Sequence, residues 1–449
     1  MSEEKKPQLA KSINAFEGMM YVIGLVIGSG VFLKPAVVLR NMDSTAAALG
    51  MWVAGGIITI TAALTIAEIA AYIPKVGGLY TYLTELYNEV TGFLFGWVGT
   101  LINVPGSAAA VAIACATFST FFVPMNGFQQ KCFAVSLVVV LVAAQILSTR
   151  NGVWLQTVAT IGKLLPIAAI AIFGLMQGTI NHINTDSVGL LKSAAPGIAL
   201  LGVLWAYDGW LSTCTLAADM KRPEKDIPKA IVLGISFVMA VYVAFNAAIF
   251  FVLPGDVAAA SNKIGVDVCV QLFGTSGAAF ITIGMMLSVF GTCNALITCG
   301  SRYTFAMAER KHLPAPRALA AIHPKLGSPV NALIFQGVIA ILYILTGTFD
   351  SITDLIVFAL WIFYTLGVVS IFILRKRMPR NPNLYHVPLY PVVPVVGILG
   401  GLYLMFATLK DSPTSAMFGL GLTLLGLPVY YYCKNKYGFD KGNDEPMKA

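Results

Sequence analysis

The stretch VIGSGVFLKP, residues 26–35, places three helix-weakening residues, Gly28, Ser29 and Gly30, inside an otherwise apolar run. A helix that crosses a membrane must satisfy its backbone hydrogen bonds internally, so an interruption is tolerated only where protein or a cavity surrounds it. Gly24 and Gly28 also form a G-x-x-x-G pair, whose usual meaning in such a helix is close packing against a neighbour. Taken alone, this stretch fits either a packing motif or a local unwinding of the helix.

The composition of the chain is that of a membrane protein. Hydrophobic residues make up 57% of the 449 residues, charged residues make up 11%, and the mean hydropathy is +0.79. A soluble protein carries about 25% charged residues. We therefore expect a protein that crosses the membrane several times. Its polar N-terminus runs directly into a long apolar segment, so no cleavable signal peptide is expected.

Apolar runs of about 20 residues are long enough to cross a bilayer as helices. The sequence predicts an all-α membrane protein with twelve transmembrane helices, at approximately 13–39, 45–73, 90–123, 132–148, 154–176, 196–218, 228–253, 276–305, 329–346, 351–374, 391–409 and 415–433.

Most of the 29 lysines and arginines lie on one side of this arrangement. They gather in the loops 220–229, 302–317 and 375–382 and in the two tails. Because positively charged loops stay in the cytoplasm, we expect both termini to be cytoplasmic and the protein to lie in the cell membrane. These charges fit topology determinants better than a lipid-binding or regulatory role. Nucleic acid is not an expected partner.

A second interruption lies in ALLGVLWAYDGWLSTC, residues 199–214, where Asp208 and Gly209 break the apolar run. An ionisable residue at membrane depth indicates function, but a carboxylate can also cap the second half of a broken helix. Both interpretations require a discontinuous helix. The first predicted helix enters from inside and the sixth from outside, so their breaks are related by an inverted repeat of five helices. Such paired breaks indicate a substrate site near the middle of the membrane.

Two further ionisable residues lie within predicted helices. Lys163, in TVATIGKLLPIAAI (157–170), is too deep to reach either membrane surface, so it must find partners inside the bundle. A mechanistic role and a structural tether both fit it. Glu68 lies near the inner end of the second predicted helix, where pairing with a cytoplasmic basic residue favours a structural role.

Enzyme chemistry finds no support in the sequence. The four histidines lack metal-ligand spacing, the seven cysteines include no C-x-x-C pair, and G-x-S-x-G and G-x-G-x-x-G motifs are absent. The lysine at 163 also lacks the glycine and the hydroxyl residue of a phosphate-binding loop. We expect no metal, no cofactor and no enzymatic activity.

Several segments together resemble the L-amino acid transporter family of the amino acid–polyamine–organocation superfamily, and most of all its bacterial serine/threonine and alanine–serine–cysteine exchangers. The resemblance extends from the first predicted helix to the last. The segments that carry it are IGSGVFLKP (27–35), AEIAAYIPKVGGLYTYL (67–83), IGKLLPIA (161–168), LWAYDGW (204–210), MKRPEKDIPKA (220–230) and SRYTFAMAERKHLP (301–314).

This resemblance implies a LeuT-type fold, with two inverted repeats of five helices whose first helices, 1 and 6, are discontinuous. It divides the chain into a cytoplasmic tail (1–12), a first repeat (13–176), a second repeat (196–374), two peripheral helices (391–433) and a second cytoplasmic tail (434–449).

The resemblance also implies where the substrate binds. The amides of Gly28, Ser29 and Gly30 would hold the α-carboxylate of an amino acid. The α-ammonium would be held by backbone carbonyls left free at the two breaks, those of Val26, Ile27, Leu204 and Trp205. Trp205 would close over the substrate as an aromatic gate. The side-chain region would be shaped by Ala206, Tyr207 and Asp208.

Two residues are implied in coupling or conformational change. Lys163 matches a helix 5 lysine that, in sodium-independent members, occupies the region of a sodium site, and Tyr242 matches a tyrosine that hydrogen-bonds near it. Animal members pair with a heavy chain through a cysteine between helices 3 and 4. Here the nearest cysteine, Cys132, lies at the start of helix 4, so we expect no heavy-chain subunit, only the amino acid substrate and membrane lipid as partners.

The activity implied is sodium-independent exchange of small neutral L-amino acids, such as alanine, serine, threonine and cysteine, by alternating access. Proton-coupled uptake with Lys163 as the titrating group is one alternative. Exchange of cationic amino acids at Asp208 is another. A channel or sensor is the alternative from a different class.

Overall fold

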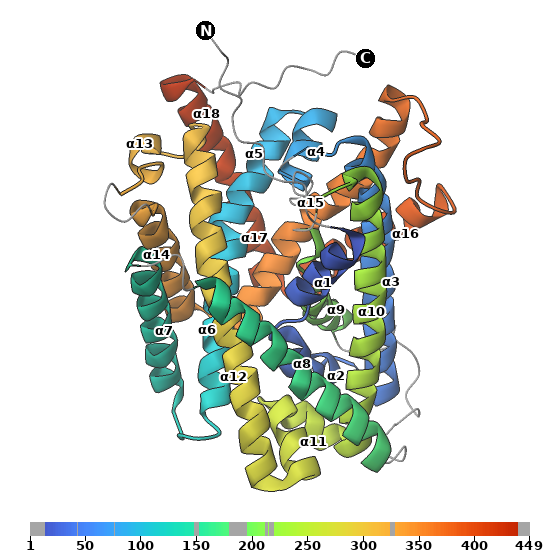
Figure 1. Ribbon diagram of the computed structural model, residues 1–449, viewed down its shortest axis with the longest axis vertical. Coiled ribbons are helices and arrows are strands. Elements are labelled where there is room, and N and C mark those ends of the chain that lie inside the picture. Colours follow the sequence, from blue (N-terminus) through green and yellow to red (C-terminus); the bar gives the residue numbers. More distant parts are fainter. Residues whose placement is uncertain are drawn as a thin grey trace. The chain divides into compact units, whose positions relative to one another are not determined.

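The computed structural model of the chain describes residues 14–42, 44–75, 77–147, 152–178, 195–211, 214, 220–323 and 328–438, and for residues 152–164 it describes the helix but not the side chains. The elements in these ranges are helices (Figure 1). They belong to two compact units, each built from three stretches of the chain.

The first unit comprises residues 1–92, 171–260 and 361–411. Its helices are α1 (Ala15–Val26), α2 (Gly30–Arg40), α3 (Thr45–Tyr72), α4 (Leu79–Leu86), α9 (Pro196–Ala206), α10 (Pro223–Val252), α11 (Gly255–Ala260) and α16 (Val392–Asp411).

The second unit comprises residues 93–170, 261–360 and 412–449. Its helices are the π-helical turn η1 (Gly99–Asn103), α6 (Val104–Ser119), α7 (Gly127–Leu147), α12 (Ile264–Glu309), α13 (Pro316–Leu319), α14 (Val330–Thr346), α17 (Pro413–Leu424) and α18 (Gly426–Tyr437). Three helices belong to both units along the chain: α5 (Glu89–Val98), α8 (Gly152–Gln177) and α15 (Phe349–Arg377).

Eight helical segments of the described part are long and apolar enough to cross a membrane, two of them joining consecutive elements (Glu89–Ser119 and Pro413–Tyr437), and the bent pair α1 and α2 makes a ninth if it is one span. Three shorter apolar helices, Leu165–Gln177, Pro196–Ala206 and Val330–Thr346, accompany them. The prediction of an all-α protein that crosses the membrane several times is therefore confirmed. The count of twelve spans and their inverted repeat stay predictions.

Local sequence signals explain where the first helices begin. At α1, the Asn14 side chain accepts the Glu17 amide at 3.0 Å, and the Glu17 carboxylate accepts the Asn14 amide at 2.8 Å. This reciprocal capping box satisfies two amides that the first turn leaves without partners. At α3, the Ser44 hydroxyl oxygen accepts the Ala47 amide at 3.1 Å.

In the first unit, α10 runs along both α1 and α3, while α2 packs against α9 and α16 packs against α3 (Figure 1). Small residues permit these close approaches. A Cβ added to Gly234 of α10 would lie 2.7 Å from Cγ1 of Val22 in α1, and one added to Gly55 of α3 would collide with Val203 of α9. Packing through small residues is how helices associate where water does not drive them together.

In the second unit, α6 lies along α12, and α14 packs against α6, α7 and α12 (Figure 1). The turn η1 lies between α5 and α6. Gln336 of α14 donates to the Thr100 carbonyl at 2.9 Å, and the Tyr343 hydroxyl donates to the Leu101 carbonyl at 3.1 Å. The wider π-helical turn thus joins α14 to the backbone before α6.

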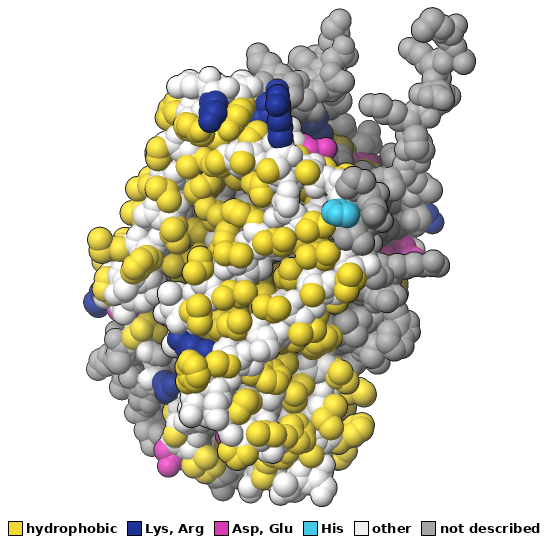
Figure 2. All heavy atoms as spheres, turned by 90° about the vertical axis from the view of Figure 1, so that its left-hand side faces the viewer, with side chains coloured by type: hydrophobic (Ala, Val, Ile, Leu, Met, Phe, Trp, Pro, Cys, Tyr) yellow, Lys and Arg dark blue, Asp and Glu magenta, His cyan; other side chains and the backbone are white. Residues whose placement is uncertain are grey.

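The outer faces of α7 and α14 carry exposed apolar side chains, among them Val139, Val140, Val338 and Leu342. Figure 2 shows one face of the molecule on which hydrophobic side chains dominate and charged ones are few. An apolar surface of this kind indicates contact with lipid.

Candidate functional site

The first predicted helix is broken within its Gly-Ser-Gly stretch. α1 ends at Val26, α2 begins at Gly30, and the two are bent by 53°. Ser29 precedes α2, but its side chain makes no capping hydrogen bond. Among the described residues, the Ser29 and Gly30 amides meet no acceptor. The start of α2 therefore presents N–H groups and the positive end of its dipole, both of which attract an anion.

The sixth predicted helix is also discontinuous. α9 ends at Ala206, and the chain then turns through Tyr207, Asp208 and Gly209. Gly209 has a φ of +110°, a backbone conformation that glycine adopts without steric cost. Beyond this turn, residues 212–213 and 215–218 of the predicted helix lie outside the described part of the chain.

The two breaks lie against each other within the first unit. A Cβ added to Gly30 would lie 2.9 Å from Cα of Ala206 and 3.0 Å from Cδ1 of Trp205. A Cβ added to Gly209 would lie 3.1 Å from the backbone oxygen of Leu25. Both positions need glycine because the backbones of the two broken helices approach too closely for a side chain.

Tyr242 of α10 links the ends of the two helices. Its hydroxyl oxygen lies 3.0 Å from the Val26 carbonyl oxygen and 2.9 Å from that of Ala206, the last residues of α1 and α9. The hydroxyl has one proton, so it donates to one of these carbonyls at a time. The Gly28 amide also hydrogen-bonds Tyr242. Because the Tyr242 side chain is fully buried, water does not compete for these bonds.

The carbonyls at the breaks differ in part from the sequence expectation, which left four of them free. The Val26 carbonyl accepts from Tyr242, and the Trp205 carbonyl accepts from the Asp208 amide at 3.3 Å. No described residue donates a hydrogen bond to the carbonyl of Ile27 or to that of Leu204. These two are the ones that stay available to a ligand.

Tyr207, expected in the side-chain region of the substrate site, braces the turn after α9. Its hydroxyl donates to the Trp52 carbonyl of α3 at 3.2 Å, and its ring centroid lies 6.1 Å from that of Trp52 and 5.1 Å from that of Tyr242. The Tyr207 side chain is 1% exposed. It therefore ties the break to the core of the first unit.

Asp208 is half-buried beside the break. Its Oδ1 accepts a hydrogen bond from the Tyr364 hydroxyl of α15 at 2.9 Å, and its carboxyl group also hydrogen-bonds the Gly209 amide. The Tyr364 contact could not be predicted from the sequence, because the two residues are 156 positions apart.

Two lysines, Lys163 and Lys34, lie within the predicted transmembrane helices. Lys163 lies in α8 among the positions whose side chains are outside the described part, so its role and its expected proximity to Tyr242 stay predictions. Lys34, within the stretch 26–35, is fully buried in α2. A Cβ added to Gly202 of α9 would lie 3.3 Å from Cδ of Lys34, so this glycine makes room for the lysine.

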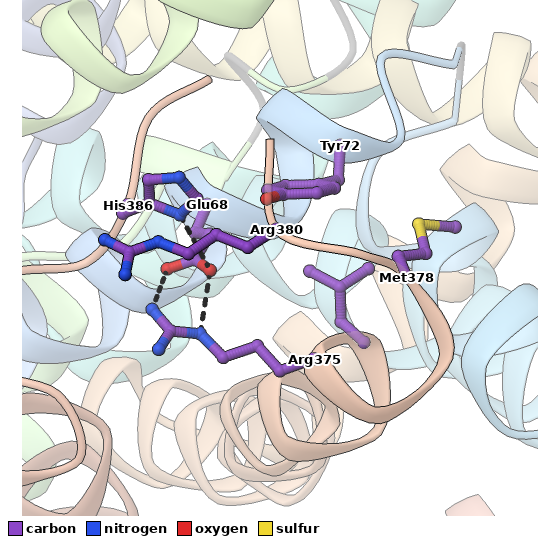
Figure 3. Close-up of a pocket in the computed structure, with 7 residues that line it drawn as sticks. Glu68, Tyr72, Arg375, Met378, Arg380 and His386 are labelled. Atoms are coloured by element: carbon purple, nitrogen blue, oxygen red, sulfur yellow. Dashed lines mark hydrogen bonds and ion pairs between the residues drawn. The ribbon is translucent and has the colours of Figure 1, made fainter. Parts of the chain in front are cut away.

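A separate charged cluster surrounds Glu68 near the end of α3 (Figure 3). Its carboxylate is 1% exposed and accepts two hydrogen bonds from Arg375 of α15, at 2.9 Å to Nε and 2.8 Å to Nη2. The Val387 amide donates to the same carboxylate at 2.6 Å, and Nδ1 of His386 lies 3.5 Å from it. Glu68 therefore pairs with a basic residue, as its position in the sequence suggested.

The same cluster fixes the connection between α15 and α16. The Arg375 guanidinium lies 3.7 Å above the Tyr390 ring, and the Asn381 amide donates to the Tyr72 hydroxyl at 3.0 Å. Burial and the nearby Glu68 carboxylate raise the pKa of the Tyr385 hydroxyl. A shallow hollow opens here, lined by Glu68, Tyr72, Leu374, Arg375, Met378, Arg380 and His386 (Figure 3). Because the Glu68 carboxylate already accepts hydrogen bonds from Arg375 and Val387, we interpret the cluster as a structural link between α3, α15 and the connection to α16.

No group of three or more histidine, cysteine or acidic side chains able to hold a metal ion occurs among the residues that the structure describes.

Comparison with known proteins agrees with this architecture. A family model described as amino acid permease matches residues 13–424. The chain is 37% identical over 429 residues to the serine/threonine exchanger SteT of Bacillus subtilis, which covers 95% of this chain and 98% of that protein.

Two animal proteins are also similar. The b(0,+)-type amino acid transporter 1 of Mus musculus is 30% identical over 451 residues, covering 98% of this chain and 91% of that protein. The large neutral amino acids transporter small subunit 2 of Homo sapiens is 30% identical over 441 residues, covering 94% and 80%. The chain therefore belongs to the amino acid permease family, in the L-amino acid transporter branch of the amino acid–polyamine–organocation superfamily.

Proposed function

We propose that this protein exchanges small neutral L-amino acids across the cell membrane by alternating access, without sodium. The observation that carries the proposal is the contact between the two helix breaks, where Gly30 meets Ala206 and Gly209 meets Leu25. Backbone groups without partners at this place suit a ligand that carries both a carboxylate and an ammonium group. An α-amino acid is such a ligand.

Of the three amides expected to hold the α-carboxylate, that of Gly28 hydrogen-bonds Tyr242, so the amides of Ser29 and Gly30 are the proposed receptor. They begin α2, so the positive end of the helix dipole adds to their attraction for an anion. Gly28 leaves open space around this point, because a Cβ added there would meet only the Val26 carbonyl oxygen, at 3.9 Å. A carboxylate can therefore approach the backbone closely.

The carbonyls of Ile27 and Leu204 are the proposed receptors for the α-ammonium, and Trp205 is the proposed gate. These carbonyls end the first halves of the two broken helices, where the dipole is negative. Tyr242 fixes their spacing by holding the neighbouring carbonyls of Val26 and Ala206. Opposite charges of the substrate would thus meet opposite helix ends.

The names of the relatives support the substrate class and the mode of transport. The bacterial relative is a serine/threonine exchanger, and the animal relatives transport amino acids. Exchange without sodium needs something in place of the ion, and we assign this role to Lys163. We further propose twelve spans in a LeuT-type inverted repeat, both termini in the cytoplasm, and function without a heavy-chain subunit.

The proposal is tested by uptake of labelled L-serine into proteoliposomes in sodium-free buffer, with and without unlabelled L-serine inside. We expect uptake into the loaded vesicles only, and inhibition by external alanine, threonine and cysteine. Equal uptake into empty vesicles would contradict exchange. Dependence on sodium would contradict the role of Lys163, and inhibition by large or charged amino acids alone would contradict the substrate class.

A further inference from the structure

Tyr364 of α15 contacts the only carboxylate at the helix breaks in the described part of the chain. We propose that Tyr364 is a specificity-determining residue that holds Asp208 away from the substrate, so that the exchanger accepts neutral amino acids and excludes cationic ones. This inference rests on the proposed function, because it concerns the same substrate site.

The geometry engages the Asp208 carboxylate from within the protein. The Tyr364 hydroxyl donates to Oδ1 at 2.9 Å, and the Gly209 amide hydrogen-bonds the same carboxyl group. A hydrogen bond from a neutral donor to a carboxylate is among the stronger ones in proteins. Both donors come from the first unit, one from α15 and one from the turn after α9. The carboxylate is therefore oriented toward α15.

Tyr364 is itself held firmly in place. Its side chain is 4% exposed. Its ring centroid lies 5.9 Å from that of Trp210, at an interplanar angle of 61°, and 5.8 Å from that of Trp361, at 59°. Trp210, which follows the break, and Trp361, which precedes Tyr364 in α15, thus pack against the ring and fix where the hydroxyl points. A fixed donor can bias the orientation of a carboxylate in a way that a mobile one cannot.

The chemistry of specificity follows from what the carboxylate lacks. With two internal donors, Asp208 gains little from the ammonium of a lysine side chain, while that ammonium loses its water on entering the site. Without the Tyr364 hydroxyl, one carboxylate oxygen loses its donor. A cationic substrate side chain then supplies the missing partner, and binding of cationic amino acids becomes favourable.

The test compares Tyr364→Phe with the wild type for inhibition of labelled L-serine exchange by L-lysine and by L-alanine. We expect the inhibition constant for lysine to fall about tenfold in Tyr364→Phe, the scale of one lost hydrogen bond to a charged group, while that for alanine changes little. The matched control is Tyr87→Phe, which removes a hydroxyl that donates at 2.9 Å to the Leu366 carbonyl of α15, the helix that carries Tyr364. It should not alter the lysine-to-alanine ratio.

The double variant Tyr364→Phe with Asp208→Asn decides the mechanism. Its gain for lysine should vanish, since the carboxylate that attracts the cation is gone. An unchanged lysine constant in an active Tyr364→Phe protein, or a gain that persists in the double variant, would overturn the proposal. If Tyr364→Phe is not recovered folded, Tyr364→Leu is tested under the same criteria. Absence of serine exchange by the wild type would instead contradict the proposed function. Failure of the proposed function and failure of the inference about Tyr364 therefore give different results.

Discussion

At the scale of single residues, glycines and one tyrosine shape the proposed site. Gly30 and Gly209 permit two broken helices to touch, and Tyr242 ties the carbonyls at their ends. None of these residues is proposed to recognise the substrate through its side chain. These residues place backbone groups where a zwitterion can bind. Substitutions should therefore lower the affinity for substrate more than they lower the stability of the protein.

Gly30→Leu should abolish binding of L-serine while the protein still inserts into the membrane. Even a Cβ at this position would lie 2.9 Å from Cα of Ala206, so the longer side chain separates the two breaks. Serine binding to purified protein, measured by calorimetry, reports the loss. The control is Gly50→Leu, because nothing lies within 4 Å of a Cβ added to Gly50. Normal serine affinity in Gly30→Leu would mean that the glycine belongs to a packing motif and not to a binding site.

Tyr242→Phe should weaken apparent serine affinity about tenfold, because the buried hydroxyl proton that the Val26 and Ala206 carbonyls share is lost and the relative position of the two helix ends relaxes. The concentration dependence of serine exchange measures this change. Tyr343→Phe, which removes a hydroxyl that donates to the Leu101 carbonyl, is the control in the second unit. Equal effects of the two substitutions would show that Tyr242 has no special role.

At the scale of helices, the Glu68 cluster joins α3, α15 and the connection that leads to α16. Its carboxylate is buried and takes two guanidinium hydrogen bonds and one backbone amide. Hydrogen bonds to a charged group contribute more to stability than those between neutral groups, although Arg375 itself is 30% exposed. The cluster is therefore expected to matter more for stability than any exposed ion pair.

Glu68→Gln should lower the stability of the solubilised protein by about 1.5 to 3 kcal/mol, since the charge-assisted hydrogen bonds to the buried carboxylate weaken while Arg375, which is 30% exposed, stays partly hydrated. Thermal unfolding followed by tryptophan fluorescence measures the change. Glu85→Gln provides the comparison, because Glu85 pairs with Lys75 at the surface, where both side chains are about one third exposed. That pair should contribute about 1 kcal/mol or less. Similar melting temperatures for the two variants would contradict the stabilising role of the Glu68 cluster.

What the sequence predicted at this scale was local. The breaks at Gly28 to Gly30 and after Ala206 follow from glycine, serine and aspartate inside apolar runs, which need no knowledge of the rest of the fold. The helix predicted at 276–305 lies within the part of α12 that follows Gly274, whose φ of +66° breaks the helical backbone, and it ends before Glu309, the last residue of α12. Propensity and hydropathy thus locate elements well and their ends less well.

Contacts between residues far apart in the chain could not be predicted from the sequence. Tyr242 lies 216 positions from Val26, and Tyr364 lies 156 from Asp208, so no spacing rule connects them. The pairing of Glu68 with a basic residue was expected, but not that the residue is Arg375. The burial of Lys34, which results from the packing of α2 on α9, was not predicted either.

At the scale of the whole molecule, the proposed orientation can be checked by chemical labelling. Cys132 is exposed near the start of α7, on the expected outer side, whereas Lys376 lies in the last turn of α15, on the expected inner side. A membrane-impermeant maleimide should label Cys132 in intact cells. In a Cys132→Ser background it should label Lys376→Cys only after permeabilisation. Labelling of Lys376→Cys in intact cells would reverse the proposed topology.

The central claim is that the paired helix breaks serve obligatory exchange of amino acids. Its most direct test is the efflux of labelled L-serine from sodium-free proteoliposomes. The predicted result is that label leaves the vesicles when unlabelled serine or threonine is added outside, and stays inside when buffer alone is added. Efflux at the same rate into buffer alone would contradict the account.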